Sequence, residues 1–164
     1  MINQEISELL HSRICGRRTA FLCIGNMLCS DDAAGMRIGE LIRSAAAAGG
    51  YLVCQCSTAP ENFTGELRSF APESVILIDA AHMTRAPGTV FVIPEGDIKG
   101  ASFSTHMLPL NILTDYIRQE ICSETAVIGI QPVSCEAGTG MCAGVEQAVR
   151  ELSAEIIRAM SAAE

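Results

Sequence analysis

The sequence predicts an α/β protein, a three-layer α/β/α sandwich around a five-stranded, mostly parallel sheet. Short continuous apolar runs such as TAFLCIG (19–25) and SVILIDA (74–80) have the length and composition of strands that are buried on both faces. Segments with helical spacing separate these runs. An alternation of strands and helices is typical of a parallel sheet that helices cover on both faces.

The expected elements follow from apolar spacing and from residues that break helices. The segment at 2–14 has apolar residues at helical spacing, and Gly16 ends that helix. A second helix, at 33–48, ends at Gly49 and Gly50. The other expected elements are a strand at 51–56, a short helix at 61–70, strands at 74–80 and 88–94, a helix at 108–122, a strand at 125–131 and a helix from about 141 to 161.

The strand at 88–94 is expected to run antiparallel to its neighbours. Only AHMTRAP (81–87) separates it from the preceding strand, and a parallel crossover needs about a dozen residues or more. The chain must then return across the sheet through residues 95–107. This path brings His106 to the carboxyl edge of the parallel strands, where sites of open α/β sheets form.

Length and charge limit the possible classes of protein. The 164 residues, 49% of them apolar, suffice for a single domain over 1–164, which we divide into an amino-terminal helical extension (1–18) and an α/β core (19–161). A net charge of −8 without a basic cluster argues against nucleic acid or anionic lipid as a partner. No apolar stretch reaches roughly 18 residues, so we expect no membrane insertion.

The eight cysteines are expected to be reduced thiols that are mostly buried. The sequence has no secretory signal and no CxxC pair, which argues against a disulfide scaffold and a structural zinc site. We therefore expect a cytoplasmic protein. Cys54 and Cys56, two residues apart in a strand, should face the same side.

Asp32, Asp79 and His106 form the candidate site at the carboxyl edge. They come from the loop after the first strand, the end of the strand at 74–80 and the segment before a helix. Two carboxylates and an imidazole suit nickel, zinc or manganese, and they also suit general acid and base catalysis.

Each of these residues also has a structural interpretation. Asp31 or Asp32 could cap the helix that follows, Asp79 could cap a local turn, and His106 could be a hydrogen-bonded structural histidine. His82, three residues after Asp79, is a rival ligand.

Gly25, Asn26 and Gln131 are candidates for a substrate groove. Backbone amides and the side-chain amide of Asn26 could hold an extended peptide, or Asn26 could satisfy its own tight turn. A nucleotide-binding domain is a weak alternative, because CIGNML follows a strand but the chain contains neither GxGxxG nor a phosphate-binding GxxxxGKS/T motif.

Together, the motifs IGNMLCSDDAAG, STAPEN, ILIDAAHM, STHMLPLNIL and GIQP resemble those of the nickel-iron hydrogenase maturation endopeptidases. The likeness spans about residues 19–150. Within this family, the chain most resembles the branch that processes the large subunit of the formate-hydrogenlyase type of hydrogenase. The resemblance implies an endopeptidase that removes a carboxyl-terminal extension from the large-subunit precursor after nickel insertion.

The resemblance also implies roles for the candidate residues. The acidic residue of the first loop, the aspartate that ends the third strand and the histidine before the later helix fall on Asp32, Asp79 and His106. These would contact a nickel ion that the precursor carries, with Asp32 and Asp79 as the catalytic residues of an aspartic-type peptidase. The alternative is a non-proteolytic binding protein of the same fold that recognises a metal-loaded partner.

Overall fold

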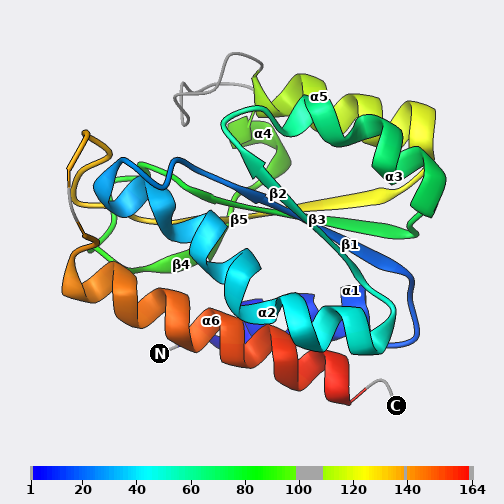
Figure 1. Cartoon of the computed structure of the whole chain (residues 1–164), viewed down its shortest axis with the longest axis horizontal. Coiled ribbons are helices and arrows are strands. Elements are labelled where there is room, and N and C mark those ends of the chain that lie inside the picture. Colours follow the sequence, from blue (N-terminus) through cyan, green and yellow to red (C-terminus); the bar gives the residue numbers. More distant parts are fainter. Residues whose placement is uncertain (1, 99–108, 139, 163–164) are drawn as a thin grey trace.

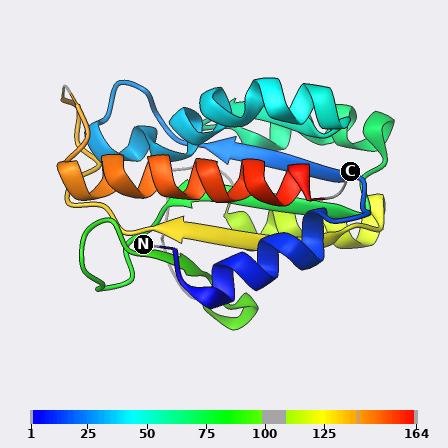
Figure 2. The ribbon, with the colours of Figure 1, turned by 90° about the horizontal axis from the view of Figure 1, so that it is seen from below.

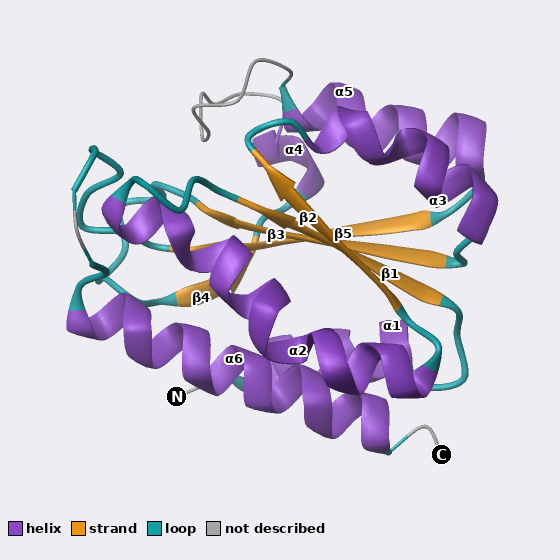
Figure 3. Cartoon of the chain, in the orientation of Figure 1, coloured by secondary structure: helices purple, strands orange, loops and turns teal. Residues whose placement is uncertain are grey.

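A mixed β-sheet separates two layers of helices (Figures 1 and 3). The computed structural model describes residues 2–98, 109–138 and 140–162. Within them, one five-stranded sheet has the order β2-β1-β3-β5-β4. Its strands are β1 (Thr19–Ile24), β2 (Leu52–Ser57), β3 (Ser74–Ala80), β4 (Val90–Val92) and β5 (Glu124–Ile130).

The strand directions confirm the predicted fold class. β1 pairs in parallel with β2 and β3, and β3 pairs in parallel with β5. β4 pairs antiparallel with β5. The short connection after β3 therefore has the effect expected from its length.

The helices cover both faces of the sheet. One face carries α1 (Gln4–Ile14), α2 (Ala34–Gly49) and α6 (Ala143–Ser161), and the other carries α3 (Thr64–Phe70), α4 (Glu95–Ile98) and α5 (Leu110–Tyr116). Short 3-10 helices, η1 (Ser30–Ala33) and η2 (Pro60–Phe63), precede α2 and α3, and a π-helical turn, η3 (Ile117–Ile121), continues α5. The sequence did not predict α4, because a single turn leaves no periodic pattern.

The sheet is buried on both faces, which explains the continuous apolar runs. Phe21 and Ile76 pack with α1, α2 and α6 in one core cluster, and Leu22 and Leu77 pack with α3 and α5 in a second cluster. All residues of β1 and β3 are buried.

The amino-terminal helix α1 packs into the first of these clusters. Its residues Ile6, Leu10 and Ile14 are fully buried there, and α1 contacts α6 (Figure 2). The predicted helix is confirmed, and α1 shares a core with the residues that follow it. The division of the chain at residue 18 stays a prediction.

The cysteines differ in exposure. The described residues include all eight, and all are free. Cys54 and Cys56 both belong to the second core cluster, which confirms that they face the same side. The expectation of mostly buried thiols is wrong, because only Cys23, Cys54 and Cys56 are buried. The others lie in loops or at helix ends, where backbone and solvent replace a packed core.

Gly35, in the first turn of α2, lets that helix pack directly on strand backbone. A Cβ atom at Gly35 would lie 2.1 Å from the Ile24 carbonyl oxygen and 2.5 Å from the Ile78 carbonyl oxygen. Real Cβ atoms do not approach backbone so closely, so a larger residue would push α2 away from the ends of β1 and β3.

Asp31 joins two loops that are far apart in the sequence. Its side chain is 1% exposed and accepts hydrogen bonds from the backbone N–H groups of Val133 (2.8 Å), Ser134 (3.3 Å) and Cys142 (2.7 Å). α2 and η1 have no side-chain cap. The predicted capping role of Asp31 or Asp32 is therefore wrong, because the orphan amides that Asp31 satisfies belong to the loop after β5.

These hydrogen bonds also set the ionisation of Asp31. Burial by itself raises the pKa of a carboxyl group, but the three backbone donors favour the charged form, and the net pKa of Asp31 is lowered.

Among the helices of the described residues, none is long and apolar enough to cross a membrane.

Gly35→Ala should lower the free energy of unfolding by about 2 kcal/mol or more, because the new methyl group collides with two carbonyl oxygens. Gly65→Ala, in α3, is the matched control. A Cβ atom there meets nothing within 4 Å, so this change should stabilise the protein by about 0.5–1 kcal/mol through helix propensity. Urea unfolding measures both changes. Equal stability of Gly35→Ala and the wild type would contradict the close approach of α2.

Asp31→Asn should lower the free energy of unfolding at neutral pH by about 1–3 kcal/mol, because the amide group places an N–H against backbone donors. The folded-state pKa of Asp31 is lowered, so its contribution is complete above the unfolded pKa of about 3.9 and is lost as the pH falls through the folded pKa. The difference between wild type and Asp31→Asn should therefore shrink below about pH 4. Urea unfolding at several pH values, with Asp115→Asn as a control, measures it.

Thiol titration without reductant should find eight free thiols in denaturant. In the native protein, Cys122 is exposed and should react first. Cys23, Cys54 and Cys56 should not react, since burial excludes the reagent and raises the pKa of Cys54 to about 12. Fast native reaction at these three positions would contradict their burial.

Candidate functional site

The candidate site lies at the carboxyl edge of the parallel strands. Figure 2 shows the ends of β1 and β5 pointing to the same side of the molecule. The loop after β1 (25–29) and the loop after β5 (131–142) meet there. They are joined by a backbone bridge between Cys29 and Gly138 and by the hydrogen bonds of Asp31.

The loop after β1 folds back tightly onto Asp32. Gly25 has a φ of 148°, and a Cβ atom there would lie 2.0 Å from the backbone oxygen of Asp32. The next residue, Asn26, donates its N–H to the same oxygen at 3.1 Å. Only glycine allows this approach, and the contact fixes Asp32 beside the end of β1.

Asp32 and Asp79 are buried carboxylates from neighbouring elements. Asp32 lies in η1 and is 5% exposed, while Asp79 is the penultimate residue of β3 and is 1% exposed. η1 contacts β3, because Gly35 lets the start of α2 settle onto that strand. Asp32 and Asp79 thus lie on neighbouring elements at the same edge of the sheet, and their joint role in a site stays a prediction.

A pocket of about 240 Å³ opens beside Asp32. Its lining comes from the loops and turns after β1, β2 and β5, namely Asn26, Cys29, Asp32, Thr58, Ala59, Glu61 and Cys135. Among the described residues, the lining contains two carboxylates and no basic side chain. Such a pocket favours a cationic or hydrogen-bond-donating occupant.

The pKa of the Cys135 thiol reflects the negative charges of this site. Burial, the charge and hydrogen bond of Asp32, and the charges of Asp79 and Asp31 together raise the pKa of the Cys135 thiol to about 12. The thiol therefore stays protonated at neutral pH and is a poor nucleophile. Its sulfur also lies 3.9 Å from the Nε2 atom of His82, whose side chain is exposed.

The candidate groove residues have identifiable structural partners. The Asn26 side chain accepts the N–H of Leu28 at 3.0 Å, which is the tight turn weighed above, and Asn26 also lines the pocket. Gln131 is buried; its Oε1 accepts the N–H groups of Met83 and Arg85, and its Nε2 donates to the Pro132 carbonyl. A direct role of these side chains in substrate binding stays a prediction.

His106 lies outside the described residues, so its position relative to the aspartates stays a prediction. Within the described part of the chain, no group of three or more His, Cys, Asp and Glu side chains has the arrangement of a metal site. Asp32 and Asp79 are thus the two described side chains of the predicted set.

Sequence reasoning did not nominate Glu61, Cys135 or Asp31 as site residues. Glu61 and Cys135 line the pocket. Asp31 accepts hydrogen bonds from the loop that carries Cys135. A signal for the first two was available, because both follow the carboxyl ends of strands, where α/β sites form. No comparable signal identified Asp31, because its partners lie about a hundred residues away.

Comparison with known proteins gives a consistent result. The family model of the hydrogenase maturation proteases matches residues 36–159. A putative hydrogenase maturation protease of Methanocaldococcus jannaschii is 35% identical over 124 residues, which cover 71% of this chain and 73% of the relative. The hydrogenase 3 maturation protease of Escherichia coli K12 is 36% identical over 112 residues, which cover 68% of this chain and 70% of the relative.

A solved structure is similar over almost the whole chain. The crystal structure of the NiFe hydrogenase maturation protease HycI from Thermococcus kodakarensis superposes with a TM-score of 0.84 at 27% identity, covering 93% of this chain and 99% of that one. The α/β fold and the sequence match point to the same proteins, and the chain belongs to the hydrogenase maturation protease family.

Proposed function

We propose that the chain is an endopeptidase that removes the carboxyl-terminal extension of a nickel-iron hydrogenase large-subunit precursor after nickel has been inserted. The main support is a pair of buried carboxylates in a member of this protease family: Asp32 lines a pocket at the carboxyl edge of the sheet, and Asp79 lies in β3, which contacts the helical turn of Asp32. Family membership does not favour the alternative of a non-proteolytic binding protein.

The two carboxylates support recognition of a cation that the substrate carries. Carboxylate oxygens bind divalent metals, but two of them leave most coordination positions of such an ion open. A nickel ion held by the precursor would have other ligands of its own. In this proposal Asp32, Asp79 and His106 contact the ion from outside, and the peptidase needs no permanent metal.

Asp32 and Asp79 also provide a means of rejecting immature substrate. Like charges in one site oppose joint ionisation, and a cation removes that repulsion. A precursor without nickel would therefore bind less well than a loaded one.

The hydrolytic step requires an activated water molecule and a positioned peptide bond. A carboxylate of Asp32 or Asp79 can accept the proton of that water. Substrate nickel can polarise the scissile carbonyl group. The protonated thiol of Cys135 favours these routes over a cysteine nucleophile.

Apolar side chains at the rim support docking of a protein substrate. Leu28 and Val133 are 77% and 60% exposed, and they lie on the two loops that Asp31 and Gly138 join. Exposed apolar side chains beside a polar site are typical of partner contacts.

We propose the cytoplasm as the compartment of this protein, since free thiols fit a reducing environment.

Asp32→Asn, Asp79→Asn and His106→Ala should each abolish shortening of a nickel-loaded precursor, because each removes a contact to the metal or to water. Relief of carboxylate repulsion should leave the melting temperature of the two Asn variants within a few degrees of wild type. Mass spectrometry of the precursor after incubation with each purified variant measures processing.

The matched control is Asp97→Asn, an exposed aspartate of α4, which should process normally. Nickel-free precursor should remain uncut by the wild type. Processing by Asp32→Asn or Asp79→Asn at the wild-type rate would refute their assignment, and an unchanged mass with wild type and competent precursor would refute the peptidase function.

A further inference from the structure

β2 is an edge strand of the sheet, and of its backbone N–H groups that of Ser57 donates to the Met36 sulfur at 3.2 Å. In the described residues it pairs only with β1. Its six residues, LVCQCS, include no charged residue and no proline, which are the usual devices that block edge pairing. The opposite edge strand, β4, has only three residues, precedes Pro94 and contacts α1. The two edges thus differ in how open they are to a further strand.

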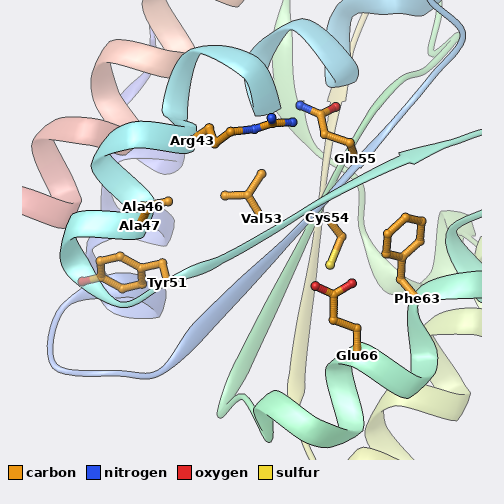
Figure 4. A pocket seen from close by; sticks show the side chains of 9 residues that line it. All are labelled: Arg43, Ala46, Ala47, Tyr51, Val53, Cys54, Gln55, Phe63 and Glu66. Carbon is orange, nitrogen blue, oxygen red and sulfur yellow. The ribbon is translucent and has the colours of Figure 1, made fainter.

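A groove of about 300 Å³ runs along β2, which we call the β2 groove. Figure 4 shows α2 on one side of the strand, with Arg43 and Ala47, and the η2–α3 segment on the other side, with Phe63 and Glu66. Because the side chain of Ala47 is small, the groove is open at this position of α2. The two walls carry opposite charges on opposite sides of the strand.

The β2 groove leads toward the candidate active-site pocket. Thr58 and Ala59, which directly follow β2, line that pocket together with Asp32. η2 forms a wall of both, since it contributes Phe63 to the groove and Glu61 to the pocket. A chain that lies along β2 would therefore extend toward the buried carboxylates.

Two buried acceptors along this path have no hydrogen-bond partner in the described part of the molecule. They are Oε1 of Gln55, in the groove, and Oε2 of Glu61, in the pocket. Buried acceptors without partners are costly. The N–H groups of a bound polypeptide are suitable donors.

We infer that the β2 groove binds an extended segment of the precursor polypeptide next to the bond that is cut, as an added strand of the sheet. The inference rests on the proposed peptidase function. Main-chain groups of the segment pair with the free edge of β2, a recognised mode of peptide binding. Because successive side chains of a strand point to opposite faces, alternate side chains of the segment meet the wall with Arg43 and the wall with Glu66.

Ala47→Trp fills the groove and tests this inference. Ala47 is exposed, so the new ring should leave the core intact. With nickel-loaded large-subunit precursor as substrate, KM should rise at least about tenfold, as expected for loss of a central contact, while kcat changes little. Ala48→Trp, at the next exposed position of the same helix but outside the groove, should behave as wild type.

Hydrogen exchange adds a direct readout. The Asp79→Asn variant should not cut the precursor and should bind it more weakly, so the precursor is supplied at saturating concentration; the amides at 52–57 should then exchange more slowly, because the groove contacts do not involve Asp79. Glu66→Arg, on the other wall, provides a second variant whose KM should rise if Ala47→Trp does not fold.

The outcomes separate this inference from the proposed function. Normal cutting with unchanged KM in Ala47→Trp and Glu66→Arg, or with unprotected β2 amides, would overturn the inference and leave the peptidase intact. Protection of β2 by a precursor that wild type does not cut would support the groove and refute the peptidase. Concentration-dependent protection in the protein alone would show that a second copy of the chain occupies the groove, which also overturns the inference.

Discussion

The direct contact between the start of α2 and the backbone of β1 and β3 determines the geometry of the site. It depends on the absence of a side chain at Gly35, since a single carbon there would overlap the carbonyl oxygens of Ile24 and Ile78. The contact sets the distance between η1 and the sheet, and η1 carries Asp32 toward β3, whose penultimate residue is Asp79. Backbone packing thereby places two carboxylates from separate elements at the same edge of the sheet.

Asp31 and Asp32 are neighbours in the sequence with different environments. Three backbone N–H groups hold Asp31 in its charged form, whereas Asp32 lines a pocket. Asp31 binds backbone N–H groups of the loop after β5, and Asp32 lines the pocket to which Cys135 of the same loop also contributes. Adjacent acidic residues can therefore combine a fixed structural charge with a charge that is available to a substrate.

Most of the fold could be predicted because burial on both faces leaves a clear mark. The strands around Phe21 and Ile76 were visible as apolar runs, and the short connection after β3 gave the direction of β4. The carboxyl-edge rule brought Asp32 and Asp79 together. Close approaches such as that of Gly35 could not be predicted, since a helical glycine looks the same whether it touches backbone or solvent.

The rest of the site could not be predicted from the sequence, because its contacts join residues that lie far apart along the chain. Asp31 resembles a helix cap in sequence, and only the folded loop after β5 shows which amides it satisfies. The position of Glu61 and Cys135 after the carboxyl ends of strands indicated the right edge of the sheet, but only the fold shows that η2 and that loop converge on Asp32. The open edge of β2 likewise depends on strand order, which local patterns do not specify.

The hydrogen bond between Asp31 and the Cys142 amide closes a separation of 111 residues along the chain. Loops of such length close at an entropic cost that only later packing offsets, and chains fold from the amino terminus during synthesis. A nascent chain that has not yet emerged beyond β5 from the ribosome has both carboxylates but not the wall that Cys135 and its loop supply. The pocket is therefore completed only after the loop that follows β5 has been synthesised and has folded against Asp31, and a shorter nascent chain carries both carboxylates in an incomplete site.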